Sequence, residues 1–349
     1  MTVPSLRTSQ AVVYDPPRSD LLLEVRDLRV QFPLDEGTVR AVDGVSYTLR
    51  RGRTLGVVGE SGCGKTVTAQ SVLRIVPRPG QIVGGEIIYY PPDGPAVDLA
   101  KLDPRGDRIR SIRGKEIAYI FQEPMAALSP VHTIAHQMIE RIRLHLKLGK
   151  DEARAHAIET LARVGMPRPS QLIDRYAHQL SGGQRQRAII AMALACHPSL
   201  LIADEPTTAL DVTTEAQILE LLLELQHEFG MAMQYITHNL GVVAELVDDV
   251  VVMYLGKPVE YGPVETIFED PRHPYTRALL RSIPKLGKKS HERLASIKGM
   301  VPDPYQIPAG CAFHPRCPRY QPGVCDEPVY MDVGPEHLVL CNRAGDPWE

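Results

Sequence analysis

The stretch that decides the fold reads Gly59-Glu60-Ser61-Gly62-Cys63-Gly64-Lys65-Thr66. Residues 54–58 before it form a short apolar run that predicts a buried strand, and residues 65–76 after it are expected to form a helix. Glycines in such a loop let successive backbone N–H groups turn toward an anion, and the N-terminus of the helix adds positive charge. A chance glycine turn would lack these flanking elements, so the sequence predicts a loop that binds the phosphates of a nucleotide.

The polar side chains of this loop have separate expected tasks. Lys65 is expected to neutralise the β- and γ-phosphates, and the hydroxyl of Thr66 to ligate Mg²⁺. Phe32 ends the first expected strand and is a candidate for stacking on adenine, although an aromatic residue there fits the core equally well. The residues expected to bind ATP are Phe32, Gly59, Ser61, Gly62, Cys63, Gly64, Lys65, Thr66 and Val67.

An acidic pair follows the apolar run at residues 200–203, which predicts a buried strand. Asp204 and Glu205 stand at the end of this strand, where α/β sheets place their ligands. Asp204 is expected to hold Mg²⁺ directly or through water, and Glu205 to orient or deprotonate the attacking water. In isolation the pair would fit an acidic surface turn before Pro206, so this prediction depends on the phosphate loop.

The composition limits the class of protein. The chain has 349 residues, 44% of them hydrophobic and 23% charged, with a formal net charge of −3. That charge gives no indication of nucleic acid as the main ligand. No uncharged apolar run reaches about 18 residues, so no membrane span is predicted. Residues 1–20 lack the apolar core of a secretory signal, and we expect them to form a flexible extension of a chain that stays in the cytoplasm.

Strands and helices alternate along the chain, which predicts an α/β fold with a mixed sheet. Further strands are expected at 39–49, 232–237, 250–254 and 257–261, and the strand at 21–30 is expected to be an edge or half-buried strand. Further helices are expected at 133–148, 151–164, 184–194 and 214–229. Residues 284–310 are rich in lysine, proline and glycine, so we interpret them as a linker.

The string Leu180-Ser181-Gly182-Gly183-Gln184 completes the pattern. With the phosphate loop and the acidic pair, it makes residues 21 to about 283 resemble the nucleotide-binding subunits of ABC transporters, with a helical subdomain at about 90–185. The resemblance implies that Ser181, Gly182, Gly183 and Gln184 bind the γ-phosphate held by an opposite subunit. From the residues alone, a serine that merely caps a helix fits as well.

The same resemblance assigns three further positions. Gln122 matches the residue that senses Mg²⁺ near the membrane subunits, and Asp211 matches a position at the interface between two ATPase subunits. His238 follows a buried strand and matches the histidine that contacts the γ-phosphate. The expected catalytic residues are thus Glu205, His238 and Gln122, and Mg²⁺ is expected at Thr66, Gln122 and Asp204.

Longer strings look like those of dipeptide and oligopeptide importers, among them Phe121-Gln122-Glu123-Pro124-Met125 and His273-Pro274-Tyr275-Thr276. This resemblance implies two multispanning permeases, a second ATPase subunit (a copy or a paralogue) and an extracytoplasmic binding protein as partners, with no nucleic acid. It places the chain peripherally on the cytoplasmic face of the inner membrane. Importers of nickel or other chelated cargo share most of these strings. A non-transport ABC ATPase would carry a long coiled coil or two ATPase domains, which this chain lacks.

The segment 284–349 contains Cys311, Cys317, Cys325 and Cys341, spaced Cys-x5-Cys-x7-Cys-x15-Cys. In a reducing compartment such clustering favours metal over disulfides. The thiolates fit an iron–sulfur cluster or zinc, or they remain free, and the spacing lacks the Cys-x2-Cys pairs of common zinc sites. The peptide-importer resemblance implies a [4Fe–4S] cluster with a structural role.

Overall fold

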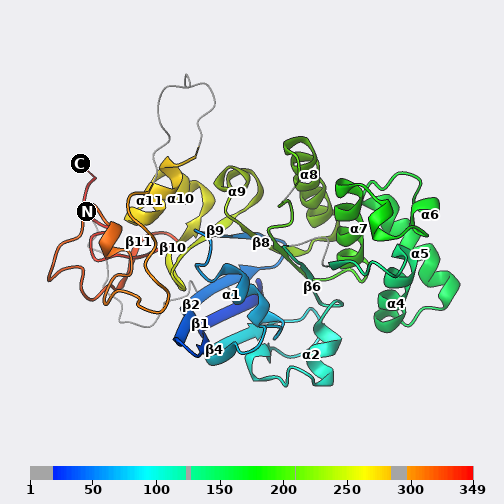
Figure 1. Cartoon of the computed structure of the whole chain (residues 1–349), viewed down its shortest axis with the longest axis horizontal. Helices are drawn as coiled ribbons and strands as arrows, with labels where there is room; N and C mark the ends of the chain where they lie inside the picture. The colour runs from blue at the N-terminus through cyan, green and yellow to red at the C-terminus, as the bar shows by residue number, and fades with distance from the viewer. Residues whose placement is uncertain (1–18, 123–126, 209, 284–296, 349) are drawn as a thin grey trace.

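The computed structural model describes residues 19–122, 127–208, 210–283 and 297–348, and its strands form two sheets (Figure 1). The larger sheet has the strand order β11-β12-β10-β9-β3-β8-β7-β6, and the smaller one β2-β1-β4-β5. Within these described ranges, no helix is both long and apolar enough to cross a membrane. Residues 1–18 of the extension expected at 1–20, and the motif residues 123–126, lie outside the described residues.

The centre of the larger sheet is parallel. β3 (Thr54–Val58), β8 (Ala232–Thr237), β7 (Leu200–Asp204) and β6 (Ile117–Ile120) run side by side, and β9 (Asp249–Tyr254) lies parallel to β3 on its other side. These strands are buried along their whole length, which explains their nearly continuous apolar sequences. Their carboxyl ends share one edge of the sheet, so the segments that follow β3 and β7 come close together.

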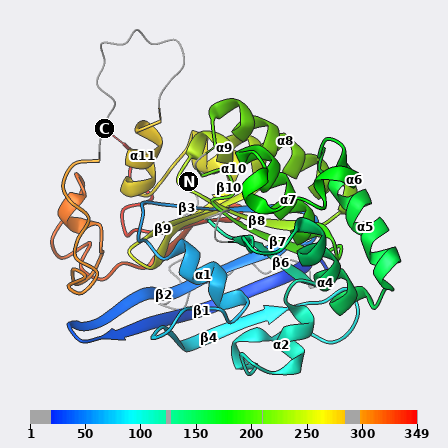
Figure 2. The ribbon, with the colours of Figure 1, turned by 45° about the vertical axis from the view of Figure 1, so that its right-hand side comes forward.

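The smaller sheet is antiparallel and lies beneath the larger one in the view of Figure 2. β1 (Leu21–Leu34) pairs with β2 (Gly37–Arg50) on one side and with β4 (Gln81–Tyr89) on the other, and β4 also pairs with β5 (Val97–Asp98). β1 is therefore an inner strand and not an edge strand, whereas its mixture of buried and exposed residues fits the half-buried alternative. β4 was not predicted, because its glycines hide the strand pattern.

Helices flank both sheets. α1 (Lys65–Val72) follows the glycine loop, α8 (Val212–Phe229) precedes β8, and α9 (Leu240–Leu246) precedes β9. α10 (Val264–Glu269) and α11 (Pro274–Arg281) follow β10 (Lys257–Pro263). α1 ends at Val72 rather than at residue 76, because Arg74 adopts the left-handed conformation with φ of 56°.

A separate group of helices lies at one end of the molecule (Figure 1). It consists of α4 (Ile134–Leu146), α5 (Lys150–Arg163), α6 (Pro169–Leu172) and α7 (Gly182–Leu194). The expected helical subdomain at about 90–185 also spans β5, α2 (Asp107–Ile112) and β6. β5 and β6 belong to the two sheets, so the helical group itself begins near Ile134.

The cysteine-bearing segment packs on the ATPase core. β11 (Tyr330–Gly334) and β12 (His337–Leu340) extend the larger sheet, because β12 pairs with β10 through Glu260↔Val339. Phe313 and Val339 are fully buried. Nε2 of His337 donates a hydrogen bond of 2.8 Å to the buried carboxylate of Glu260. Residues 297–348 therefore share the hydrophobic core of the strands before them.

Candidate nucleotide site

The glycine loop makes close backbone contacts that require glycine. Gly59 has φ of 150°, and a Cβ there would lie 2.2 Å from the carbonyl oxygen of Met253. Gly64 has φ of 97°, and its Cβ would lie 2.2 Å from the carbonyl oxygen of Ala41. Neither position admits a side chain, so the loop is fixed against β9 and β2 before any ligand arrives.

Lys65 is the first residue of α1 and lies buried over the loop. Its ammonium group donates to the carbonyl oxygens of Gly59 at 2.8 Å and Glu60 at 3.1 Å. A phosphate in the loop would offer this cation a stronger, charged acceptor. The predicted placement of Lys65 at a site suited to anions is consistent with this geometry.

Asp204 ends β7 and is buried to 1% exposure. Its Oδ1 accepts a hydrogen bond of 3.2 Å from Thr66, and its Oδ2 accepts one of 2.8 Å from Tyr119. Burial raises the pKa of Asp204, and the two neutral donors only partly offset this. The negative charge of this buried carboxylate is not neutralised by its two neutral donors. The carboxylate of Asp204 and the hydroxyl of Thr66 are therefore a suitable pair of oxygen ligands for Mg²⁺.

Glu205 brings together the three side chains expected to act in catalysis. Its Oε2 accepts hydrogen bonds from Gln122 at 3.0 Å and from Thr208 at 3.1 Å. Its Oε1 lies 3.0 Å from Nδ1 of His238. Residues from three loops, each at the carboxyl end of a parallel strand, thus converge on one carboxylate.

The environment of Glu205 keeps it ionised. Burial alone would raise its pKa, but the hydrogen bond and charge of His238 outweigh burial and lower it. The residue has φ of 45°, and its N–H donates to the carbonyl of Ile236 at 2.9 Å. A glutamate held in the left-handed region costs about 1–3 kcal/mol, and such strain is typical of functional positions.

Comparison with known proteins identifies the family. Two family models match: "ABC transporter" over residues 42–208, and "Oligopeptide/dipeptide transporter, C-terminal region" over residues 259–325. The "Probable peptide ABC transporter ATP-binding protein y4tR" of Sinorhizobium fredii is 47% identical over 333 residues, which cover 95% of this chain and 97% of that protein. The chain belongs to the ABC transporter family.

Other relatives agree with this ABC transporter assignment. The "Putative peptide import ATP-binding protein BMEII0863" of Brucella melitensis biotype 1 is 50% identical over 92% of this chain and 97% of its own. A solved dimeric bacterial ABC transporter cassette has a TM-score of 0.60 and 25% identity, covering 70% of this chain and 99% of that one. CbiO1 from Clostridium perfringens has a TM-score of 0.57 and 28% identity, covering 72% and 92%. The predicted family, fold class and ATPase activity are confirmed.

The signature residues of this ABC ATPase start α7. Ser181 is the N-cap: its hydroxyl accepts a hydrogen bond from the N–H of Gln184 at 3.3 Å, and the Gln184 side chain accepts one from the N–H of Ser181 at 3.0 Å. Gly182 and Gly183 form the first turn. In Figure 1, β6 lies between α1 and α7, so the helix that carries the signature is separated from the helix that follows the glycine loop.

Two predicted residues have local partners that leave their roles untested. Asp211 is the N-cap of α8, and its carboxylate accepts hydrogen bonds from the N–H and the hydroxyl of Thr214 at 2.9 and 2.8 Å. Phe32 is partly buried on β1 and packs so closely on Gly80 that a Cβ there would lie 2.6 Å from its ring. Both remain predictions as interface and adenine contacts.

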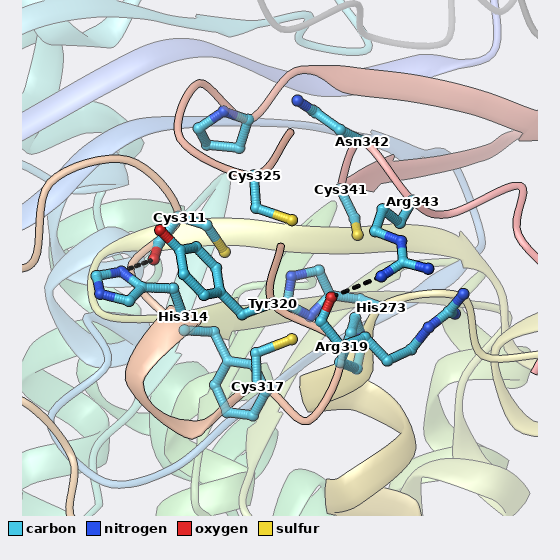
Figure 3. Close-up of a pocket in the computed structure, with 13 residues that line it drawn as sticks. His273, Cys311, His314, Cys317, Arg319, Tyr320, Cys325, Cys341, Asn342 and Arg343 are labelled. Atoms are coloured by element: carbon cyan, nitrogen blue, oxygen red, sulfur yellow. Dashed lines mark hydrogen bonds between the residues drawn. The ribbon is translucent and has the colours of Figure 1, made fainter. Parts of the chain in front are cut away.

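The four cysteines of the C-terminal segment line a single cavity with Arg319, Tyr320 and Arg343 (Figure 3). All four are free, and their sulfur atoms surround the same space. Burial raises the pKa of the thiols of Cys311 and Cys317, and raises that of Cys341 to about 12. Over the described residues, no three His, Cys, Asp or Glu side chains form a group that could hold a metal ion.

The sequence did not reveal Tyr119 and Thr208, which hold the two carboxylates. Tyr119 lies on β6, and the apolar run at 117–120 that ends at Phe121-Gln122 is the signal that would have located this strand. Thr208 lies three residues after Glu205, a spacing that allows a turn to bring its hydroxyl back. Both contacts depend on the neighbouring strands being in place.

Proposed function

We propose that this chain is the ATP-hydrolysing subunit that powers uptake of dipeptides or oligopeptides through an ABC importer. The observation that carries the proposal is the Glu205 carboxylate, held between Gln122 and His238 next to Asp204. The chain that carries this arrangement is similar, over nine tenths of its length, to proteins named for peptide transport or peptide import.

Residues 59–67 bind the phosphates of ATP, and Phe32 stacks on the adenine ring. Lys65 exchanges its carbonyl partners for phosphate oxygens, and the backbone N–H groups at the start of α1 add their dipoles. Thr66 and Asp204 would hold Mg²⁺, with Gln122 close by, and the ion would neutralise charge on the β- and γ-phosphates. The direct contact between Thr66 and Asp204 supports this role.

Glu205 acts on the attacking water. Because its pKa is lowered, it is ionised at neutral pH and accepts a hydrogen bond from water in line with the γ-phosphate. His238 is 65% exposed, so its ring is free to turn from Glu205 toward the phosphate. Gln122 links the same carboxylate to the segment that leads to the helical group.

Two ATPase subunits act as a pair. Ser181, Gly182, Gly183 and Gln184 meet the γ-phosphate bound by the opposite subunit, and Asp211 lies at the interface. The separation of α7 from α1 within one chain supports this arrangement (Figure 1). ATP closes the pair, and hydrolysis at Glu205 opens it again, a rigid-body switch driven by γ-phosphate contacts.

The partners that we propose are those implied by the resemblance to peptide importers. They are two multispanning permeases, a second ATPase subunit and an extracytoplasmic binding protein, with the chain on the cytoplasmic face of the inner membrane. A nickel or chelate importer would use the same ATPase site, so the cargo is decided by experiment.

We also propose that Cys311, Cys317, Cys325 and Cys341 hold a structural [4Fe–4S] cluster. The donor set supports this, because four thiolates can ligate a cluster and Arg319 and Arg343 offset their charge. Iron and acid-labile sulfide analysis of anaerobically purified protein tests it, and zinc or no metal would refute it.

The decisive experiment is mild-detergent purification of the chain from its own membranes, with mass spectrometry of the recovered subunits. Two permeases and a second ATPase are expected. ATPase activity of that complex is then measured with its binding protein and with peptides, Ni²⁺ or no cargo. Stimulation by peptides alone supports the proposal, stimulation by Ni²⁺ favours the chelate alternative, and recovery with ribosomes or DNA refutes import.

A further inference from the structure

The C-terminal segment makes a direct ionic contact with the phosphate-binding loop. The guanidinium of Arg316 donates to both carboxylate oxygens of Glu60, at 2.7 and 3.0 Å, across 256 residues of sequence. The side chain of Arg316 is 3% exposed and that of Glu60 is 26% exposed. A two-pronged arginine–carboxylate pair fixes direction as well as distance, and a guanidinium this buried is costly without its partner.

The same residue of the loop is held from a second element. The N–H of Glu60 donates to the hydroxyl of Tyr275 at 2.8 Å. Tyr275 lies in the first turn of α11 and is completely buried, with its ring 5.5 Å from that of Phe313 and 4.7 Å from that of Tyr254. Phe313 belongs to the C-terminal segment and Tyr254 to β9. Glu60 is therefore supported by three segments, namely α11, β9 and the C-terminal segment.

Glu60 is also the residue that Lys65 contacts. The carbonyl oxygen of Glu60 accepts from the Lys65 ammonium at 3.1 Å. The backbone of one residue therefore connects the support to the cation that faces phosphate. If Glu60 shifted, the Lys65 ammonium and the neighbouring N–H groups of the loop would shift with it.

We infer that Arg316 and Tyr275 are positioning residues that hold the phosphate-binding loop in its ATP-binding shape, so that ATP affinity depends on the C-terminal segment. The inference rests on the proposed role of residues 59–67 as the phosphate site. It extends that role by making residues beyond the ATPase motifs part of the nucleotide site.

The alternative to positioning is a simple effect of charge. If Arg316 acted only as a positive charge near phosphate, Arg316→Gln would weaken ATP binding and Glu60→Gln would strengthen it. If the pair positions the loop, both variants weaken binding. The double variant should then have the same ATP affinity as the single variant that binds ATP less tightly, because both changes remove the same contact.

The test uses the full-length chain and equilibrium titration with a fluorescent, non-hydrolysable ATP analogue. Arg316→Gln, Glu60→Gln and the double variant are each expected to raise Kd about tenfold, equivalent to about 1.4 kcal/mol. Steady-state ATPase assays of the complex are expected to show a raised KM with kcat changed less than about threefold, the pattern of lost uniform binding. Arg154→Gln is the matched control, because Arg154 of α5 forms the same kind of two-pronged pair, with Asp174 at 2.8 and 2.7 Å.

Tyr275→Phe keeps the buried ring and removes only the hydroxyl that contacts Glu60. If Arg316→Gln fails to fold, this variant still tests whether the support of Glu60 affects ATP affinity. It is expected to raise Kd several-fold while leaving thermal stability close to that of the wild type. ATP affinities of folded Arg316→Gln and Tyr275→Phe within twofold of the Arg154→Gln control would overturn the inference. Opposite effects of Arg316→Gln and Glu60→Gln would overturn it too. Lys65→Ala distinguishes a failure of this inference from a failure of the proposed function. If Lys65→Ala leaves ATP affinity unchanged, the assignment of residues 59–67 as the phosphate site is wrong.

Discussion

The hydroxyl of Tyr119 donates a 2.8 Å hydrogen bond to Oδ2 of Asp204, from the strand next to it in the sheet. Thr66 occupies the other oxygen of the same carboxylate. Asp204 is thus oriented by two neutral hydroxyl groups, one from the phosphate loop and one from β6. Hydroxyl groups that orient a metal-binding carboxylate in this way usually matter for metal affinity.

Tyr119→Phe should weaken the dependence of activity on Mg²⁺. Without the hydroxyl, Asp204 loses its orienting contact, and we expect the Mg²⁺ concentration for half-maximal ATPase activity to rise roughly tenfold. Because this hydrogen bond lowers the pKa of Asp204, its loss should also move the acid limb of the activity profile to higher pH. Tyr47→Phe is the matched control, since it removes a buried 3.1 Å bond to Gln234. Equal Mg²⁺ curves for both variants would contradict the role of Tyr119.

Asp204 should make the nucleotide-free protein less stable as pH rises. Its pKa is raised in the folded state, so the folded protein holds this proton more tightly than the unfolded chain does. The resulting stability is present below the ordinary aspartate pKa of about 3.9 and is lost as pH rises through the raised value. Asp204→Asn removes this titration. The Tm of the variant should therefore rise relative to the Tm of the wild type as the pH increases from low to neutral. A difference in Tm that does not change with pH would refute this.

Glu205→Gln should separate binding from hydrolysis. The amide keeps the shape of the side chain but cannot accept a proton from water, so we expect ATP hydrolysis to fall at least about 100-fold. ATP binding should persist and trap two subunits in the closed pair, which size-exclusion chromatography with and without ATP detects. Glu220→Gln, an exposed change on α8, is the control and should behave as the wild type. Normal turnover in Glu205→Gln would refute the proposed role of Glu205.

The sequence predicted the parts of the fold that have local signals. The strands at β3, β7 and β8 are short apolar runs, and the turn between β9 and β10 contains Leu255 and Gly256 with φ of 44° and 79°, which suits the expected hairpin. The capping pattern at Ser181 placed the start of α7 within a residue or two. These features depend on neighbours in sequence, so spacing and residue type reveal them.

The remaining features depend on partners far away in sequence. β4 contains Gly84 and Gly85, and its position beside β1 comes from the register Val25↔Ile87. The pairing of β12 with β10 joins segments about 77 residues apart, and the pair Arg316–Glu60 joins segments 256 apart. A single sequence carries no local pattern for such contacts, so the sequence does not predict that the C-terminal segment packs against the phosphate loop.

The C-terminal segment should unfold together with the ATPase core. Trp348, the one tryptophan of the sequence, lies between Arg277 of α11 and Arg319, at 4.3 and 4.4 Å, so its fluorescence reports the junction of the segment with the core. Because β12 continues the larger sheet and Phe313 is buried among core aromatics, urea transitions followed by tryptophan fluorescence and by circular dichroism should coincide.

Phe313→Ala tests the same coupling energetically. Removing a fully buried phenylalanine should lower the free energy of unfolding by about 3–5 kcal/mol and shift both urea transitions together. Tyr305→Ala, in the same segment but 41% exposed, should cost less than about 1 kcal/mol. If Phe313→Ala moved the fluorescence transition alone, the segment would unfold independently, and the support it gives to Glu60 could be lost without loss of the ATPase core. A joint shift means that the phosphate loop and the segment that holds it form one cooperative unit.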